Sequence, residues 1–131
     1  MTTGRWQRIE GALVFAGGIA VVWVQSGFAP LWPGWALMLL FLAPDLGMLC
    51  YLAGPKIGAA GYNALHLYGA GALLIAVGGA LGVPMLTAGG ALWMAHVGVD
   101  RLLGYGLKEV TGFKVTHLGP IGGASGRDRS E

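Results

Sequence analysis

The sequence predicts an all-α fold: an antiparallel bundle of four transmembrane helices with both termini in the cytoplasm. The first indication is composition, because the 131-residue chain is 55% hydrophobic and only 11% charged, whereas soluble domains carry about 25% charged residues. The second is the presence of four long apolar stretches. The third is the placement of Lys and Arg, which occur before the first stretch, between the second and third, and from the end of the fourth onward. This is the positive-inside pattern of cytoplasmic segments.

The four predicted spans cover about residues 6–25, 35–52, 57–81 and 85–104. Each is close to the ~20 residues that cross a ~30 Å hydrocarbon layer. The connections between spans are short, which favours antiparallel neighbours, and the two connections on the outer side carry no charge. We expect residues 1–119 to form a single transmembrane domain and residues 120–131 to form a flexible polar tail.

Glycine is unusually frequent, with 25 residues in the chain. Glycine weakens helices in water, but in a membrane small residues allow helix backbones to approach closely. We therefore expect the glycine pairs within the spans to mark close helix packing. These pairs are Gly17-Gly18, Gly78-Gly79 and Gly89-Gly90.

Ionisable residues inside the predicted spans are the main functional signal, since such residues are costly in a bilayer and are functional candidates by default. They are Glu10, Asp45, His66, His96 and Asp100. At 1.5 Å per residue, Asp45, His66 and His96 each lie about 14–16 Å into their spans. The antiparallel arrangement thus brings the five side chains to the middle and cytoplasmic half of the bilayer.

The spacing of these residues is compatible with two kinds of chemistry. His96 and Asp100 are four residues apart and share one helix face, and Asn63 precedes His66 by three residues on another span. A carboxylate one turn from an imidazole can accept its hydrogen bond and fix its tautomer. Alternatively, both side chains can ligate one metal. Two His and two carboxylates suit a divalent ion such as Zn, Mn or Fe.

Six sequence motifs are similar to those of a known family. They are APDLGML from residue 43, YLAGPKIG from 51, YNALH from 62, AHVGVDR from 95, GYGLK from 104 and TGFKVTHLG from 111. In order and spacing they resemble the DUF4260 family, a group of small bacterial integral membrane proteins without an established function. The resemblance covers the chain from Glu10 to Gly119. It implies a four-span, multi-pass protein of the bacterial cytoplasmic membrane, and it draws attention to His117 in the last motif.

A second, weaker likeness is to membrane-bound metal-dependent hydrolases. Those proteins carry Pro-Asp, Thr-His and His-x-x-x-Asp elements in hydrophobic segments. The chain has Pro44-Asp45 and His96-x-x-x-Asp100 in the same order. It departs from them because Thr116-His117 follows the last predicted span.

Three functions of different classes are compatible with these residues. The first is a metal-dependent hydrolase of a lipid or other amphiphile. Asp45, His66, His96 and Asp100 would hold an ion that activates water. Glu10 or His117 would serve as the general base, and Asn63, Arg101 and Lys108 would bind the substrate.

The second function is a metal-free, proton-coupled carrier or accessory protein, which would require a homo-oligomer because four spans are few for a transporter. The third is a haem-binding bundle with His66 and His96 as axial ligands. A structural partner protein would need none of these groups. We expect the bilayer as a partner and no nucleic acid, since the net charge is only +2.

Overall fold

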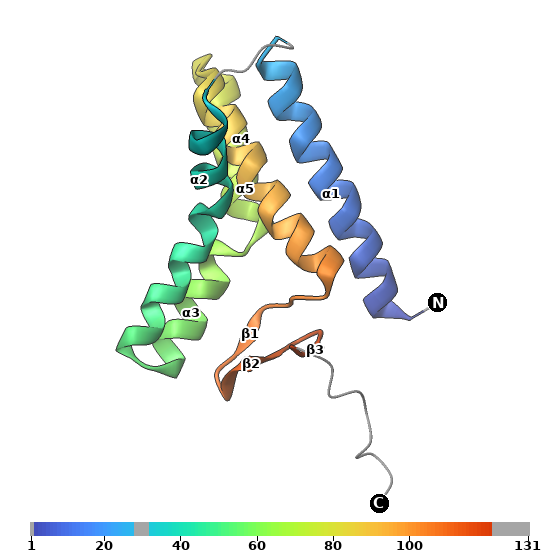
Figure 1. The fold of residues 1–131 in the computed structure, drawn as a ribbon, viewed down its shortest axis with the longest axis vertical. Coiled ribbons are helices and arrows are strands. Elements are labelled where there is room, and N and C mark those ends of the chain that lie inside the picture. Colours follow the sequence, from blue (N-terminus) through green and yellow to red (C-terminus); the bar gives the residue numbers. More distant parts are fainter. Residues whose placement is uncertain (1, 28–31, 122–131) are drawn as a thin grey trace, which may run out of the picture.

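The helices run up and down along one axis, with a small sheet at one end (Figure 1). The computed structural model describes residues 2–27 and 32–121. Helix α1 covers Thr3–Gln25, α2 covers Gly34–Leu42, and the 3-10 helix η1 continues α2 over Ala43–Ala53. The chain then turns back through α3 (Pro55–Leu65) and α4 (Tyr68–Leu81), and α5 (Pro84–Leu103) returns to the starting end.

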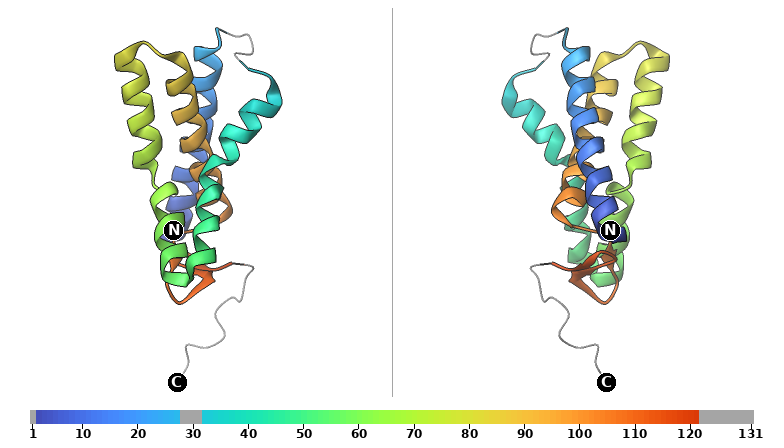
Figure 2. Two further views of the ribbon diagram at one scale, coloured as in Figure 1. Left: turned by 90° about the vertical axis from the view of Figure 1, so that its left-hand side faces the viewer. Right: turned by 90° about the vertical axis from the view of Figure 1, so that its right-hand side faces the viewer.

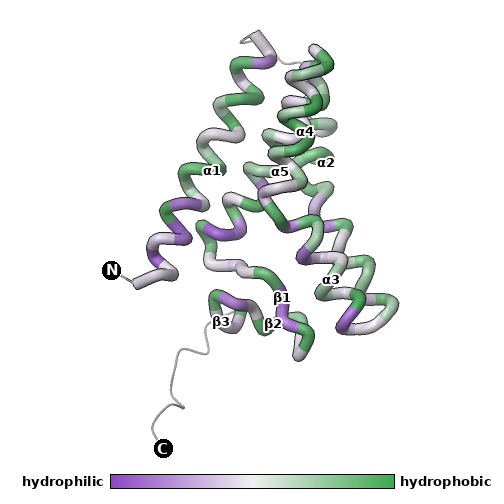
Figure 3. The backbone as a smooth tube through the Cα atoms, turned by 180° about the vertical axis from the view of Figure 1, so that it is seen from behind, coloured by the Kyte–Doolittle hydropathy of each residue, from purple (hydrophilic) through white to green (hydrophobic). Residues whose placement is uncertain are grey.

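The charged segments lie at the end of the molecule that holds the sheet. The start of α1, the turn between η1 and α3, and the end of α5 all lie toward that end (Figures 1 and 2). Most of the hydrophilic residues also lie toward this end, while the rest of the bundle is largely hydrophobic (Figure 3). Large apolar side chains are exposed on every helix, including Leu52 at 89% and Leu13 at 69%. Such a surface is unusual for a water-soluble monomer and is consistent with a membrane protein.

Two helices are long and apolar enough to cross a membrane, Thr3–Gln25 and Gly34–Ala53. The pair formed by α3 and α4 would provide a third span if it is counted as one broken helix, bent by 40°. The predicted fourth span is helical, but α5 does not match this apolarity because it carries His96, Asp100 and Arg101. The α5 helix can be less apolar because it is the central helix, packed against α1, α2, α4 and η1.

Glycine packing holds α5 against its neighbours. A Cβ added at Gly18 would lie 2.5 Å from the carbonyl oxygen of Ala91, and one at Gly90 would lie 2.6 Å from that of Gly71. Only one member of each predicted pair makes such an approach, namely Gly18, Gly78 and Gly90, because its neighbour in the sequence points to another helix face. The expectation of close packing at the pairs is therefore confirmed for half of the residues.

Two predicted spans are irregular. The span predicted at residues 35–52 changes from an α-helix to a 3-10 helix at Ala43. Pro44 explains the change, since proline lacks an N–H and its ring clashes with the carbonyl four residues earlier. The span predicted at residues 57–81 is interrupted at His66 and Leu67, where the backbone turns from ψ 22° to an extended ψ of 138°.

The chain is not all-α, because a three-stranded antiparallel sheet follows α5. Its strands are β1 (Lys108–Glu109), β2 (Gly112–Thr116) and β3 (Gly119–Pro120). Short alternating segments near a chain end give no strong strand signal in sequence, and this sheet is fixed by tertiary contact with α3. The start of the predicted flexible tail, Pro120, belongs to β3. The tail beyond residue 121 lies outside the described residues.

Candidate metal centre

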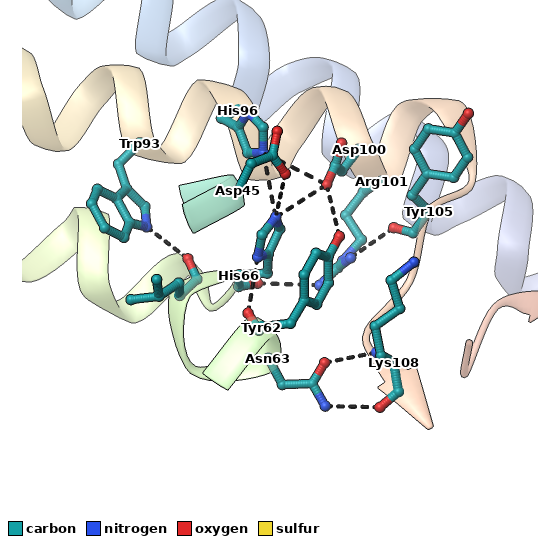
Figure 4. A network of polar contacts seen from close by, with 11 residues as sticks. Asp45, Tyr62, Asn63, His66, Trp93, His96, Asp100, Arg101, Tyr105 and Lys108 are labelled. Atoms are coloured by element: carbon teal, nitrogen blue, oxygen red, sulfur yellow. Dashed lines mark hydrogen bonds and ion pairs between the residues drawn. The ribbon is translucent and has the colours of Figure 1, made fainter. Parts of the chain in front are cut away.

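Four side chains from three elements point toward one another in the core (Figure 4). Asp45 comes from η1, His66 from the interruption after α3, and His96 and Asp100 from one face of α5. The two Nε2 atoms of the histidines are 3.3 Å apart. Asp45 Oδ1 lies 3.5 Å from His66 Nε2 and 3.4 Å from His96 Nε2. Asp100 Oδ2 lies 3.5 Å and 3.8 Å from the same two nitrogens.

These separations match the geometry of ligands around one metal ion. Zinc binds His nitrogen and carboxylate oxygen at about 2.0–2.2 Å, so that ligand atoms at the corners of a tetrahedron are roughly 3.3–3.6 Å apart. Four of the five measured separations lie between 3.3 and 3.5 Å. Asp45, His66 and His96 form a group whose ligand atoms all lie within 4.8 Å of one another. The cluster could therefore hold a divalent ion.

The hydrogen bonding of His66 directs a lone pair toward this point. His66 Nδ1 is 2.9 Å from the carbonyl oxygen of Tyr62, which can only accept, so Nδ1 carries the proton. In the neutral ring Nε2 is then an acceptor, and it faces two carboxylate oxygens. Acceptors this close repel one another unless a cation lies between them, either a metal ion or shared protons. A His that donates its second N–H to a backbone carbonyl is also the usual arrangement of a metal-ligating His.

The two irregularities of the helices place Asp45 and His66. Gly47 lets η1 press against α3, since a Cβ there would lie 2.9 Å from the Tyr62 Cα. Asp45 thereby reaches the bundle interior from the first turn of the 3-10 helix. At the interruption, the freed carbonyl of Leu65 accepts from Trp93 Nε1 at 2.8 Å. Side chains from a neighbouring helix often satisfy such backbone groups within a membrane.

Arg101 completes the same interruption. One guanidinium nitrogen donates to the carbonyl of His66 at 3.3 Å, and another donates to that of Tyr105 at 2.7 Å. Arg101 is buried next to the cluster, and the two carbonyl oxygens accept hydrogen bonds from its guanidinium group. The sequence predicts that Arg101 binds substrate. In the structure Arg101 donates hydrogen bonds to backbone carbonyls, and the substrate role stays a prediction.

Tyr62 supports two of the candidate ligands. Its ring stacks on His66 with centroids 3.7 Å apart and an angle of 13°, and its hydroxyl donates to Asp100 Oδ2 at 3.3 Å. On the other histidine, the Phe41 ring meets His96 edge-on at 5.2 Å. His96 Nδ1 is buried without a hydrogen-bond partner among the described residues. Tyr62 is detectable in sequence because it precedes His66 by one turn, but no spacing rule identifies Phe41 or Trp93.

The other two predicted substrate-binding residues join the sheet to the site. Asn63 donates to the Lys108 carbonyl at 2.9 Å and accepts from the Lys108 N–H at 2.7 Å, which docks β1 on α3. The Lys108 ammonium lies over the rings of Tyr62, at 5.0 Å, and Phe113, at 4.2 Å. Burial lowers the pKa of this ammonium, and the carboxylates of Asp100 and Asp45 partly oppose that shift. Lys108 is thus within electrostatic reach of the cluster.

The two predicted general bases lie apart from the cluster. Glu10 is exposed on α1, and His117 is exposed at the end of β2. The Leu107 N–H donates to His117 Nδ1 at 2.8 Å, so this histidine closes the sheet. None of the contacts found in residues 2–27 and 32–121 joins either residue to the four candidate ligands.

The family expected from sequence is confirmed by comparison. Residues 4–121 match the family model described as Domain of unknown function (DUF4260). No curated protein and no solved structure matches the chain, so the likeness to membrane-bound hydrolases gains no support there. Among the described residues, the matched region contains every helix and strand apart from the first residue of α1, together with the whole cluster. The chain therefore belongs to the DUF4260 family.

Proposed function

We propose that this protein binds one divalent metal ion through Asp45, His66, His96 and Asp100 and uses it to hydrolyse a lipid or other amphiphile. The observation that carries the proposal is the set of distances between four ligand atoms from distant parts of the chain. Each carboxylate oxygen lies 3.4–3.8 Å from both imidazole Nε2 atoms, and Asp45, His66 and His96 form the group that is compact enough to share one ion. That donor set favours Zn, Mn or Fe over ions that prefer only oxygen or only sulfur.

Differences in burial suggest from which side a substrate reaches the ion. His66 is fully buried, and the side chains of His96 and Asp100 are 5% and 13% exposed. Asp45 is 34% exposed, so the cluster is accessible on its η1 side. Catalytic metal sites keep such a position for water or substrate and can expand to five ligands.

The chemistry follows from these roles. A divalent ion lowers the pKa of a bound water toward about 7 and polarises a carbonyl or phosphoryl oxygen. Hydrolysis of the acyl or phosphoryl bond would add the water oxygen to the substrate, and one water proton would end on the leaving group. Asp45 is the exposed carboxylate of the cluster and is the proposed carrier of that proton. Tyr62 holds Asp100, and the Tyr62 carbonyl holds the His66 ring in its ligating orientation.

We further propose that the protein spans the bacterial cytoplasmic membrane four times, with both termini in the cytoplasm. Support comes from the described segments before α1, between η1 and α3, and after α5, which carry Lys and Arg and lie at the end of the bundle that holds the sheet (Figure 1). His96 is twelve residues from Pro84, or about 18 Å along α5, which puts the cluster in the cytoplasmic half. The pairing of α3 with α4 as one broken span is what the four-span topology requires.

Elemental analysis of mildly purified protein tests the function. Wild type should hold about one Zn, Mn or Fe per chain, and His96→Ala and Asp45→Asn should each lose it. His117→Ala is the matched control, because that histidine lies outside the cluster, and it should retain the metal. Stoichiometric metal in both cluster variants would sink the proposal.

The same preparation separates the alternatives. A metal-free wild type whose liposomes show pH-gradient-dependent flux, lost in Asp45→Asn, would favour proton relay. A Soret band would favour haem, although a haem plane between two Nε2 atoms 3.3 Å apart lacks room beside two carboxylates.

A further inference from the structure

An apolar groove lies between α1 and α2 on the side of the bundle away from the sheet. It encloses about 410 Å³ and has α5 as its floor. Its walls include Ile19, Trp23, Leu37, Met38, Phe41 and Leu92. The hydroxyl of Ser26, which also lines it, donates to the carbonyl of Trp23 at 2.7 Å, so the groove offers a ligand little but hydrocarbon contact.

One end of the groove lies beside the metal cluster, because its lining residue Phe41 also contacts His96. Phe41 and Leu92 are the lining residues at its inner end, and Asp45 and His96 follow them by four residues on η1 and α5. Residues four apart along α5 share one helix face, so Leu92 and His96 lie one turn apart on the same face. The Phe41 ring touches the His96 ring edge-on, with centroids 5.2 Å apart. Asp45, the exposed candidate ligand, follows Phe41 by four residues along the chain but does not itself line the groove.

We propose that this groove holds a single unbranched alkyl chain of the substrate, with the polar end of that substrate at the metal cluster. The inference rests on the proposed metal function and narrows its substrate class to single-chain amphiphiles, such as fatty acyl compounds. The chain would point toward the uncharged end of the bundle and the polar group toward the charged end. This is the orientation of an inner-leaflet lipid under the proposed topology.

The dimensions and surroundings of the groove favour an alkyl chain. Small-ligand sites enclose about 300–1,000 Å³, and the groove is within that range. Two of its walls are the helices that are long and apolar enough to cross a membrane, so bilayer hydrocarbon would surround its mouth. An alkyl chain is the occupant that the surroundings supply.

Alkyl hydroxamates test the proposal because their head group chelates a metal whatever their tail. Binding of acetohydroxamate, octanohydroxamate and dodecanohydroxamate would be measured on metal-loaded protein in digitonin, which has no linear alkyl chain to compete. We expect wild type to bind octanohydroxamate at least tenfold more tightly than acetohydroxamate. Met38→Trp fills the groove and should abolish that gain while leaving acetohydroxamate affinity unchanged.

Leu39→Trp is the matched control. Leu39 neighbours Met38, and the two are similarly exposed, at 63% and 57%, but Leu39 does not line the groove. It should keep the chain-length preference. Equal affinity of wild type for the three hydroxamates, with metal retained, would overturn the groove proposal alone. A protein that binds neither metal nor acetohydroxamate would overturn the proposed function as well.

A third outcome concerns a second copy of the chain. If Met38→Trp changes the oligomeric state in light scattering and the hydroxamates show no chain-length dependence, the groove is an interface and the proposal is wrong.

Discussion

The pair formed by α1 and α5 differs from the pair formed by η1 and α3, although both are close antiparallel contacts. In the first pair both helices are regular, and Gly11 and Gly98 bring the backbones together. In the second pair one partner is a 3-10 helix of 11 residues, and the other ends at His66. Long 3-10 segments are uncommon and often mark functional sites.

The difference shows where this chain departs from regular structure. None of the candidate ligands lies on α1, while the irregular pair supplies Asp45 and His66. A regular span would turn successive side chains around its axis and satisfy every backbone group internally. The interruption at His66 instead frees carbonyls that Trp93 and Arg101 then hold. We infer that the contact between α1 and α5 provides stability, and that the irregular pair brings Asp45 and His66 to the two candidate ligands on α5.

The largest expected effect is on the irregular pair. His66→Gln keeps a polar side chain of similar size but removes the Nε2 lone pair, so metal affinity should fall more than a hundredfold. That exceeds the 10–100-fold typical of a supporting residue. Metal titration followed by competition with a chelator measures the affinity. Retention of wild-type affinity would mean that His66 is not a ligand.

The contact between α1 and α5 should affect stability and not metal binding. In Gly18→Leu the added side chain meets the Ala91 carbonyl oxygen, since even a Cβ would lie 2.5 Å from it. Overpacking of this kind costs about 1–3 kcal/mol, seen as a lower melting temperature in detergent. The folded fraction should still bind metal.

Gly17→Leu is the control for that variant. Nothing lies within 4 Å of a Cβ at Gly17, so its melting temperature should stay near that of wild type. Equal destabilisation by both substitutions would show that close α1–α5 packing is not what holds the regular pair.

A smaller effect is expected at Tyr62, which joins the two parts of the cluster. Tyr62→Phe keeps the ring stacked on His66 but removes the hydrogen bond to Asp100. Metal affinity should fall about tenfold, or about 1.4 kcal/mol. Tyr105→Phe removes a hydroxyl from an exposed tyrosine and should bind metal like wild type. The idea fails if the two variants cannot be distinguished.

The smallest effect concerns pH and the sheet. Burial lowers the pKa of Lys108 below its ordinary value of 10.5, so the unfolded chain holds this proton more tightly than the folded one. Stability should therefore rise as the pH increases through the window between the lowered value and 10.5. Lys108→Met should flatten this rise in thermal melts, whereas Lys114→Met, at an exposed site on β2, should not.

Sequence patterns predicted much of the fold and the candidate ligands, but only part of the set of residues that contact and hold those ligands. The spans at residues 6–25 and 35–52 were recognisable because an apolar run near 20 residues has few other uses. The interruption at His66 was not, since no proline or glycine precedes it there, and its carbonyls are satisfied by side chains about 30 residues away. The candidate ligands were recognisable as costly residues in lipid, while Phe41 and Trp93 look like any apolar side chains.

The sequence by itself predicted apolar helices long enough to cross a membrane, the end of the bundle that carries most of the charge, and five ionisable residues inside the predicted spans, of which four lie together in the structure. These follow from solvation, because hydrocarbon penalises each charged group according to its own depth. Only the tertiary structure decided that both carboxylates lie within 3.4–3.8 Å of the two histidine Nε2 atoms, and that Glu10 and His117 do not join them. A shift of one turn in η1 or α3 would separate the ligands, and that register is set by the close contacts of Gly47 and the carbonyl bonds of Arg101 and Trp93.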